Sequence, residues 1–340
     1  MATTSGTPAK RVNFAVLGCG RIGRMHAAGL ARHARVHLVS VFDVMEAAAD
    51  ETASQLGVAR AASVESVLAD PAVEAVLIAT PTNTHVDMII AAARAGKAIL
   101  CEKPIDIDME RVRHCAREIE GLPVTIMIGF NRRFDPSFRA IRERVQQGEI
   151  GKVEQVIISS RDPDLPNMKF LAASGGMFRD MTIHDFDMAR YIVGDIADVH
   201  AFGAVLVDPA IGAAGDIDSA MITLRARSGA LVHINNTRRC VYGYDQRLEV
   251  FGAKGMLLAG NRTATTVQSS TGQHTDGSDV LLHSFIERYT DAYAAEVDHF
   301  VECLQSGTTP LTTFTDGVEA LRVAEAALES MRTGRTVSLA

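Results

Sequence analysis

The sequence is poor in cysteine, in long apolar runs and in surplus positive charge, and each shortage excludes a class of protein. Its five cysteines are scattered and form no C-x-x-C motif, which fits reduced thiols in a cytoplasm. No run approaches the roughly 18 apolar residues that span a membrane. The net charge of −7 provides no basic surface for nucleic acid. Residues 1–11 are small and polar and resemble no secretion signal, so we expect a frayed tail on a cytoplasmic protein.

The 340 residues, 47% of them hydrophobic, are enough for two domains with separate cores. Through residue 130, apolar strands alternate with helical segments, which predicts an α/β domain of the Rossmann type with a doubly wound parallel sheet. After residue 130, strands joined by short turns predict an α+β domain with an open, mainly antiparallel sheet. Partial alternation in these strands indicates one covered face and one that pairs with another subunit. We therefore assign residues 1–130 and 131–340 to two domains, the second closed by a helix over 285–304 with a core-facing aromatic side.

Residues 14–43 have the pattern of a strand, a glycine-rich turn, a helix and a second strand. Gly18 makes the tight turn, Gly20 lets the backbone approach a pyrophosphate, and Gly23 lets helix and strand pack closely. Asp43 ends the second strand, where a carboxylate accepts hydrogen bonds from ribose hydroxyls and repels a 2′-phosphate. The pattern predicts NAD rather than NADP, with a plain structural turn as the alternative. The predicted cofactor contacts in this stretch are Gly18, Gly20, Arg21, Ile22, Gly23 and Asp43.

Polar residues also follow the next two strands, at the edge of the sheet where ligands bind. The segment 80–85 can hydrogen-bond ribose or carboxamide groups, and a helix start capped by Asn83 or Thr84 is an equal alternative. Lys103 follows an apolar strand and would donate a hydrogen bond to the oxygen at a reacting carbon, unless it is a solvated tip. The predicted cofactor contacts here are Thr80, Pro81, Asn83, His85, Glu102 and Lys103.

The second domain offers Asp180 and His184, which are four residues apart and would share one face of a helix. Neutral histidine is a natural proton acceptor for an alcohol, and a nearby carboxylate would orient it and stabilise its charged form. The alternative is a helix cap and an ordinary histidine. A metal site from His184, Asp185 and Asp187 is disfavoured, because these side chains would face different directions on a helix.

Further polar residues lie near these motifs. The arginines of segment 131–135 would clamp the domains, bind a polar substrate or be solvated, and their spacing does not decide between these roles. Asp162 follows a strand, and Tyr242 and Tyr244 lie on a predicted loop that would cover a ligand. The predicted substrate contacts are Lys103, Arg133, Asp162, Asp180, His184 and Tyr242.

The motifs and their order resemble the Gfo/Idh/MocA oxidoreductases over nearly the whole chain. The motifs that carry the resemblance are Gly18-x-Gly20-Arg21-Ile22-Gly23-x-x-His26, Thr80-Pro81-x-x-x-His85, Glu102-Lys103-Pro104, Gly129-Phe130-x-Arg132-Arg133-Phe134-Asp135 and Gly175-Gly176-x-Phe178-x-Asp180-x-x-x-His184-Asp185. Segments 160–163 and 180–190 are most similar to bacterial inositol 2-dehydrogenases.

The resemblance implies an NAD-dependent enzyme of inositol catabolism, a homotetramer joined through its second-domain sheets. It implies Lys103, Asp180 and His184 as the catalytic group and no metal. The expected reaction is oxidation of a secondary hydroxyl of a cyclic polyol, myo-inositol to its 2-keto product. The alternatives are scyllo-inositol or an aldose on the same site, and a non-catalytic dinucleotide sensor on the same fold.

Overall fold

The computed structural model describes residues 11–339, so the predicted tail at residues 1–11 falls outside the described residues except for Arg11. The chain divides into two compact units. The first contains the residues up to Gly129 together with Ala294–Phe314, and the second contains Phe130–Tyr293 together with the segment from Thr315 onward.

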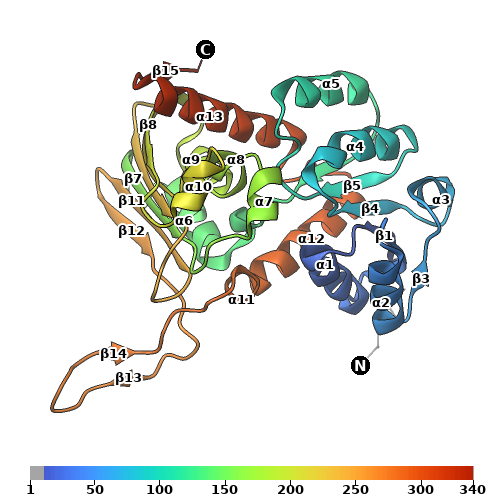
Figure 1. Ribbon diagram of the computed structural model, residues 1–340, viewed down its shortest axis with the longest axis horizontal. Coiled ribbons are helices and arrows are strands. Elements are labelled where there is room, and N and C mark those ends of the chain that lie inside the picture. Colours follow the sequence, from blue (N-terminus) through green and yellow to red (C-terminus); the bar gives the residue numbers. More distant parts are fainter. Residues whose placement is uncertain (1–10, 340) are drawn as a thin grey trace, which may run out of the picture. The chain divides into compact units, whose positions relative to one another are not determined.

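The first unit is built on a six-stranded, wholly parallel sheet (Figure 1). Its strands are, in spatial order, β3 (Ala59–Arg60), β2 (Val36–Phe42), β1 (Val12–Leu17), β4 (Ala75–Ile78), β5 (Ala98–Cys101) and β6 (Ile126–Ile128). All four residues of β4 are buried, as expected for a strand covered on both faces. The strand order reverses between β1 and β4, and ligands of such sheets bind beyond the carboxyl ends of the strands at this point. The predicted doubly wound sheet is confirmed.

Helices cover both faces of this sheet, with α1 and α2 on one face and α4 and α5 on the other (Figure 1). The short helix α3 begins at a capping box between Ser63 and Ser66. The helical elements of this part of the chain are α1 (Arg21–Arg32), α2 (Glu46–Leu56), α3 (Val64–Ala69), η1 (Thr82–Thr84), α4 (His85–Arg94) and α5 (Met109–Ile119).

Residues 294–314 pack with the first unit, whereas the sequence assigned every residue after 130 to the second domain. The Phe300 ring lies edge-on to Phe14 of β1, with 6.0 Å between ring centroids. The Ile128 N–H donates to the Thr312 carbonyl at 2.9 Å, which extends the edge of the sheet. The predicted closing helix over 285–304 is in fact two helices, α11 (Phe285–Arg288) and α12 (Thr290–Ser306), and α12 contributes to both units.

The second unit is built on a seven-stranded sheet in which only β7 and β10 pair in parallel. Its strands are, in spatial order, β12 (Gly255–Ala259), β11 (Asp245–Gly252), β7 (Val153–Arg161), β10 (Leu231–Thr237), β9 (Ser219–Ala226), β8 (Ile196–Ala204) and β15 (Val337–Ser338). The predicted open, mainly antiparallel sheet is confirmed. Burial alternates along β9, so one face is covered and the other is open.

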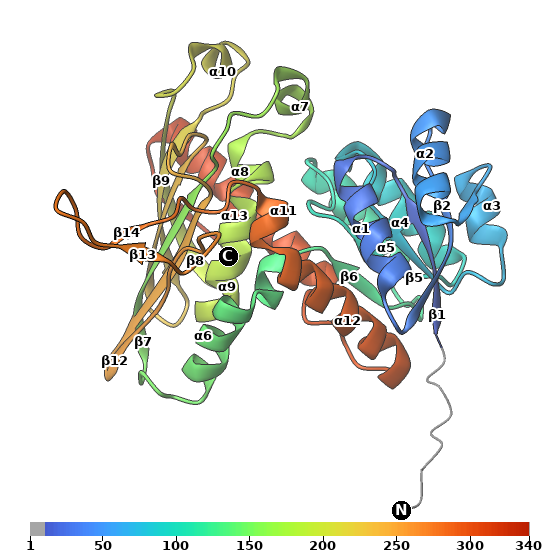
Figure 2. The same ribbon diagram turned by 90° about the horizontal axis from the view of Figure 1, so that it is seen from below.

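Helices α6, α9 and α13 lie against the covered face (Figure 2). Helix α6 begins at Pro136 because the Asp135 carboxylate accepts hydrogen bonds from the first free N–H groups, those of Ser137 and Phe138, both at 3.1 Å. The remaining elements are η2 (Asn131–Phe134), α6 (Pro136–Gln146), α7 (Met168–Ala173), α8 (Met177–Asp180), α9 (Ile183–Val193), α10 (Pro209–Ala213), β13 (Gln268–Ser269), β14 (Gly277–Ser278) and α13 (Phe314–Thr333).

The open face of the second sheet carries large apolar side chains. The strand register places Phe202 opposite Met221 and Phe251 opposite Met256, so these side chains point to the same side as their partners. The exposed apolar residues that the register places on this face are Ile157, Phe202, Met221, Leu231, Phe251, Met256 and Leu258. Such a patch marks an interaction surface more often than free surface.

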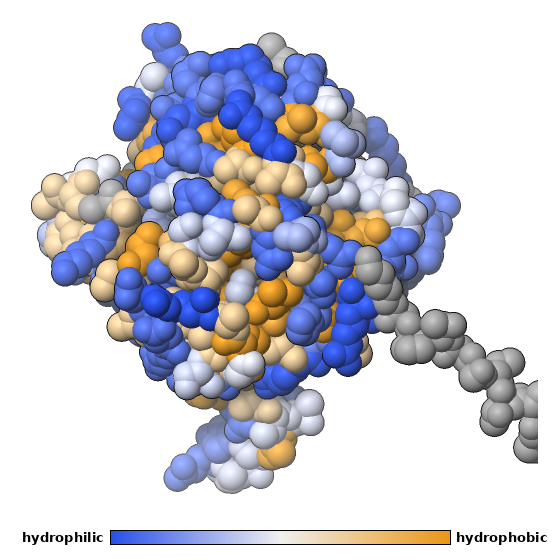
Figure 3. Space-filling model, turned by 90° about the vertical axis from the view of Figure 1, so that its right-hand side faces the viewer, coloured by the Kyte–Doolittle hydropathy of each residue, from blue (hydrophilic) through white to orange (hydrophobic). Residues whose placement is uncertain are grey.

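The sequence predicted that no segment spans a membrane, and the helices of the structure can be compared with this prediction. Within residues 11–339, no helix combines the length and the apolarity needed to cross a bilayer. On the face of the molecule seen in Figure 3, hydrophobic side chains are interspersed with hydrophilic ones.

Candidate functional site

The glycine-rich turn after β1 is packed so tightly that two of its positions accept only glycine. A Cβ on Gly18, whose φ is +102°, would lie 2.5 Å from the Ala79 carbonyl oxygen. A Cβ on Gly23 would lie 1.9 Å from the Gly18 carbonyl oxygen. At Gly20, by contrast, a Cβ would meet no atom within 4 Å, so its backbone is open to a ligand. This is the division of roles that the spacing predicted.

The N-terminus of α1 follows this turn directly. Gly20 occupies the N-cap position, and the structure describes no side chain that caps the helix there. Its carbonyl accepts the first helical hydrogen bond, from the Arg24 N–H at 2.9 Å. Arg21 is exposed and Ile22 half-buried at the helix start. Uncapped N–H groups and the positive end of the helix dipole suit a pyrophosphate.

Asp43 links the end of β2 to the glycine turn. Its Oδ2 accepts a hydrogen bond from the Cys19 N–H at 2.7 Å, and its Oδ1 accepts one from the Met45 N–H at 2.8 Å. Each carboxylate oxygen keeps a further lone pair for a ribose hydroxyl. Val44 and Met45 are 80% and 67% exposed and carry no charge that would receive a 2′-phosphate. The turn, the helix start and Asp43 together fit NAD.

The segment after β4 forms a polar turn rather than a capped helix start. Thr84 occupies the N-cap position of α4, but its hydroxyl donates to the Pro81 carbonyl at 2.7 Å instead of capping the helix. The Thr80 and Thr84 hydroxyl oxygens are also 2.7 Å apart. Pro81 and Asn83 are exposed. The predicted cap of α4 by Thr84 is therefore wrong, and the ligand role of this turn stays a prediction.

His85 lies behind this turn and is only 1% exposed, so the prediction that it contacts the cofactor is not supported. Its Nδ1 is 2.8 Å from the Pro104 carbonyl oxygen and its Nε2 is 2.9 Å from the Thr80 carbonyl oxygen. Burial lowers the pKa of His85, which favours the neutral ring with one N–H. The side chain thus lies between the turns that follow β4 and β5 and helps to position both.

Glu102 and Lys103 follow β5, as the sequence predicted. The Glu102 Oε1 is 2.7 Å from Nε2 of buried His26, and its Oε2 accepts a hydrogen bond from the Lys103 N–H at 3.3 Å. Burial alone would raise the pKa of Glu102, but the hydrogen bond from His26 and the charges of His26 and Lys103 lower it below its ordinary value. Lys103, half-buried, therefore stands beside an ionised carboxylate at the carboxyl end of the sheet.

The spacing of Asp180 and His184 predicted that both lie on one continuous helix, and this prediction is wrong. Asp180 ends α8 and His184 is the second residue of α9. The helical ladder is irregular between them, because the N–H groups of Met181 and Thr182 both donate to the Met177 carbonyl, at 2.9 and 3.0 Å. The Thr182 hydroxyl is fixed by a hydrogen bond to Asn236 Oδ1 at 2.7 Å.

A buried polar network fixes the start of α9. Asp185 is fully buried and accepts hydrogen bonds from Arg132 at 2.5 Å, Ser160 at 2.6 Å and Asn236 at 2.9 Å. This network fixes the backbone at Asp185 and therefore also at the preceding residue, His184. Among residues 11–339, no three His, Cys, Asp or Glu side chains form a group that could bind a metal ion.

Arg133 is also buried, with its guanidinium engaged inside the second unit. It donates to Asp187 at 2.6 and 2.9 Å and to Asp316 at 2.9 Å. The prediction that Arg133 binds substrate is therefore not supported, and both arginines of segment 131–135, Arg132 and Arg133, are buried. Tyr242 is 44% exposed, and its hydroxyl accepts from Arg161 at 2.7 Å and donates to Asp245 at 2.8 Å, so the phenol is held on a partly exposed loop.

Asp162 lies near Asp180 in a group of charges that includes one residue the sequence reasoning missed. Burial raises the pKa of Asp162 to about 6, with the negative charge of Asp180 adding to the rise and Arg238 opposing it. Arg238 is 1% exposed, and its Nη1 is 3.6 Å from Asp180 Oδ2. The only sequence signal was its position directly after the strand β10.

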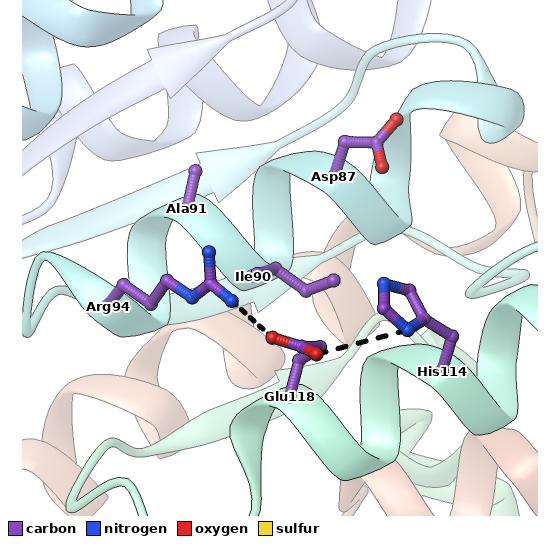
Figure 4. Close-up of a pocket in the computed structure, with 6 residues that line it drawn as sticks. All are labelled: Asp87, Ile90, Ala91, Arg94, His114 and Glu118. Carbon is purple, nitrogen blue, oxygen red and sulfur yellow. Dashed lines mark hydrogen bonds and ion pairs between the residues drawn. The ribbon is translucent and has the colours of Figure 1, made fainter.

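A separate hollow lies between α4 and α5, away from the predicted residues (Figure 4). Arg94 and His114 both face Glu118 there, so the charged groups already pair with one another. The residues that line the hollow are Asp87, Ile90, Ala91, Arg94, His114 and Glu118. It contains none of the motifs that indicate chemistry.

Two family models match the chain. Residues 12–130 match the NAD-binding Rossmann fold of the Gfo/Idh/MocA oxidoreductase family, and residues 142–339 match its C-terminal alpha/beta domain. The chain is 46% identical to an inositol 2-dehydrogenase of Rhizobium meliloti over 97% of this chain and 99% of that protein. It is 44% identical to a myo-inositol 2-dehydrogenase of Thermotoga maritima over 96% of this chain and 98% of that protein.

Solved structures agree. A myo-inositol dehydrogenase from Corynebacterium glutamicum superposes with a TM-score of 0.94 at 45% identity, covering 97% of this chain and 99% of the other. A scyllo-inositol dehydrogenase from Lactobacillus casei, solved with NAD(H) and scyllo-inositol, superposes with a TM-score of 0.90 at 28% identity, again over 97% and 99%. The chain therefore belongs to the Gfo/Idh/MocA family of oxidoreductases and has that family's NAD-binding Rossmann domain.

Proposed function

We propose that this protein is an NAD-dependent inositol 2-dehydrogenase, which oxidises one secondary hydroxyl of myo-inositol to a ketone. The observation that carries the proposal is the match, at 46% identity over nearly the full length, to an inositol 2-dehydrogenase. The residues of the chain agree with it. Lys103 follows strand β5 of the NAD-binding unit, and the polar network of the second unit anchors the helix that bears His184.

Alcohol oxidation removes a hydride and a proton, and this chain's side chains handle the proton. When bound, the nicotinamide of NAD accepts the hydride. We assign His184, in its neutral form, to accept the hydroxyl proton. Asp180 orients the imidazole and stabilises its charged form, and Lys103 donates a hydrogen bond to the substrate oxygen as its negative charge grows. We further assign Asp162 and Tyr242 to contacts with the ring hydroxyls.

The second candidate substrate is scyllo-inositol. The chain is 37% identical, over 97% of its length, to a scyllo-inositol 2-dehydrogenase of Bacillus subtilis. Aldoses are the third. A non-catalytic sensor would need the glycine turn but not Lys103, Asp180 and His184 together, so retention of all three favours an enzyme.

The decisive experiment is NADH formation with myo-inositol, scyllo-inositol and glucose, measured for wild type, Asp180→Asn, His184→Ala and the double variant. Each single change should lower kcat/KM on the order of a hundredfold or more, and the double change should cost little more, because members of one catalytic unit are not additive. His114→Ala, on an exposed face of α5, is the matched control and should behave as wild type. No NADH with any polyol would contradict the function, and multiplying losses would contradict the pairing.

We also propose a homo-oligomer, a tetramer by the family resemblance, in which the open sheet faces of two subunits pack together. Seven exposed apolar side chains on one face support this pairing, because burying them against a second copy removes them from water. Sedimentation of Phe202→Asp should show dissociation, while an unchanged mass would place the interface elsewhere. The cytoplasmic location stays a prediction.

A further inference from the structure

Arg238 is a buried cation placed between two carboxylates. It follows β10, and its N–H donates to the Asp218 carbonyl at 2.8 Å, which fixes its backbone. Its Nη1 is 3.6 Å from Asp180 Oδ2, and its Nη2 is 3.7 Å from Asp216 Oδ2. Both separations are longer than hydrogen bonds. Within the described residues, Nε and Nη2 of Arg238 are buried without a hydrogen-bond acceptor.

The two carboxylates differ in how they are held. Asp216 Oδ1 accepts a hydrogen bond from the Met177 N–H at 3.0 Å, so it is tied to the first turn of α8. Gly176 leaves the space for it, since a Cβ there would lie 2.9 Å from the same oxygen. Asp180 is at the other end of α8 and belongs to the proposed proton-transfer pair. Arg238 thus lies between an anchored carboxylate and a functional one.

The charged groups near Arg238 come from several elements. Asp180 on α8 and Asp216 after α10 lie beside its guanidinium. Asp162 after β7 feels the charges of Arg238 and Asp180, and also those of Arg132 on η2 and Asp185 on α9. Carboxylates that share a poorly solvated space repel one another, and one of them takes up a proton unless a cation compensates. Guanidinium stays charged at every physiological pH and can supply that compensation.

We propose that Arg238 is a positioning residue for the proposed Asp180–His184 pair: its buried positive charge lies beside the Asp180 carboxylate, compensates its negative charge and fixes its direction. The proposal rests on the function given above, because only an ionised Asp180 can stabilise the imidazolium that forms when His184 takes the substrate proton. The raised pKa of Asp162 is consistent with it, since that carboxyl already shows how strongly this region favours protonation. A purely structural role, filling space beneath the sheet edge, is the competing explanation.

The catalytic test compares Arg238→Met, which removes the charge, with Arg238→Lys, which keeps it. Arg239→Met is the matched control, because Arg239 is the exposed neighbour. With inositol and NAD, the acidic limb of the kcat/KM profile should move upward by about one pH unit in Arg238→Met, which is about a tenfold loss near neutrality. Arg238→Lys and Arg239→Met should keep the wild-type limb. A uniform rate loss with an unmoved limb in Arg238→Met would overturn the proposal in favour of structural filling.

The substrate-free test is the pH dependence of thermal unfolding. Removing Arg238 takes away a charge that opposes the raised pKa of Asp162, so the folded-state pKa of Asp162 should rise further above its unfolded value. Such a group stabilises the fold below the unfolded pKa, and this contribution is lost as pH rises toward the folded pKa. Arg238→Met should therefore lose stability more steeply than Arg239→Met between about pH 5 and 7. Parallel curves would overturn the proposal even if wild type fails to oxidise any polyol, so the two failures can be told apart.

If Arg238→Met does not fold, Asp216→Asn tests the same idea in the opposite direction. It keeps the acceptor oxygen for Met177 but removes one negative charge that shares Arg238. The acidic limb should then move downward, and a limb that stays in place would contradict electrostatic control of Asp180 by this group.

Discussion

Glu296 on α12 is fully buried, and in the described part of the chain neither of its carboxyl oxygens has a hydrogen-bond partner. Burial raises its pKa well above the ordinary value, and the charge of Glu102 raises it further. We therefore expect the folded protein to keep this carboxyl protonated. We predict that Glu296→Gln, which has the same shape and no charge to neutralise, stabilises the protein at neutral pH.

The magnitude follows from proton linkage. A carboxyl whose folded pKa lies above its unfolded value, about 4.3 for Glu, stabilises the fold below that unfolded value, and the contribution is lost as pH rises toward the folded pKa. Within that window each pH unit costs about 1.4 kcal/mol. For each pH unit in this window, the free energy of unfolding of wild type should therefore fall by about 1.4 kcal/mol more than that of Glu296→Gln. The difference between the two proteins isolates Glu296 from the other titrating residues.

The assay is urea unfolding at a series of pH values from about 5 to 7, followed by far-ultraviolet circular dichroism because the chain contains no tryptophan. Glu302→Gln is the matched control, since Glu302 lies on the same helix but is exposed. It should keep the wild-type pH dependence. Equal slopes for wild type and Glu296→Gln would show that Glu296 is ionised or solvated in the folded protein, and would refute the reasoning.

Three further predictions concern the NAD-binding unit. Gly23→Ala should abolish NAD binding in calorimetry because its Cβ collides with a backbone carbonyl, whereas Gly29→Ala in the same helix should raise stability by about 0.5–1 kcal/mol, since its Cβ meets nothing within 4 Å. Asp43→Ser combined with Val44→Arg should lower the ratio of kcat/KM for NAD to that for NADP, and an unchanged ratio would show that Asp43 does not contact the ribose. Lys103→Met should lower kcat on the order of a hundredfold with little change in NAD affinity, and an equal fall in affinity would give Lys103 a cofactor-binding role instead.

Local patterns predict much of this fold because they encode local geometry. The alternation of strands and helices gives the parallel sheet, and the glycine spacing gives the turn at Gly18 and Gly23. The packing of residues 294–314 is not predictable in this way. The aromatic side of the helix over 285–304 indicates burial, but periodicity does not say against which core. In the structure Phe300 packs on the first sheet while Tyr289, eleven residues earlier, is buried in the second unit.

The site residues also differ in whether a local sequence pattern predicts them. The sequence predicts the positions of Asp43 and Lys103 after strands, and the structure places both residues there, while their roles stay predictions. His85 and Arg133 also lie in motifs that follow strands, so the sequence predicts ligand contacts for them as well. In the structure their side-chain nitrogens face carbonyl or carboxylate oxygens within their own unit. Arg238 was missed for the converse reason, since its relation to Asp180 spans 58 positions of sequence and leaves no local pattern.

Two sequence motifs, segment 131–135 and segment 180–190, are joined by buried ion pairs. Consecutive arginines of η2 pair with alternate aspartates of α9, Arg132 with Asp185 and Arg133 with Asp187. Removing one partner of such a pair leaves an uncompensated buried charge and costs about 3–5 kcal/mol, so each motif stabilises the other. Asp185 and Asp187 of the second motif therefore have a structural role in these ion pairs. The chemistry proposed here needs only Asp180 and His184 from that motif, and His184 is on the helix α9 that these ion pairs hold in place.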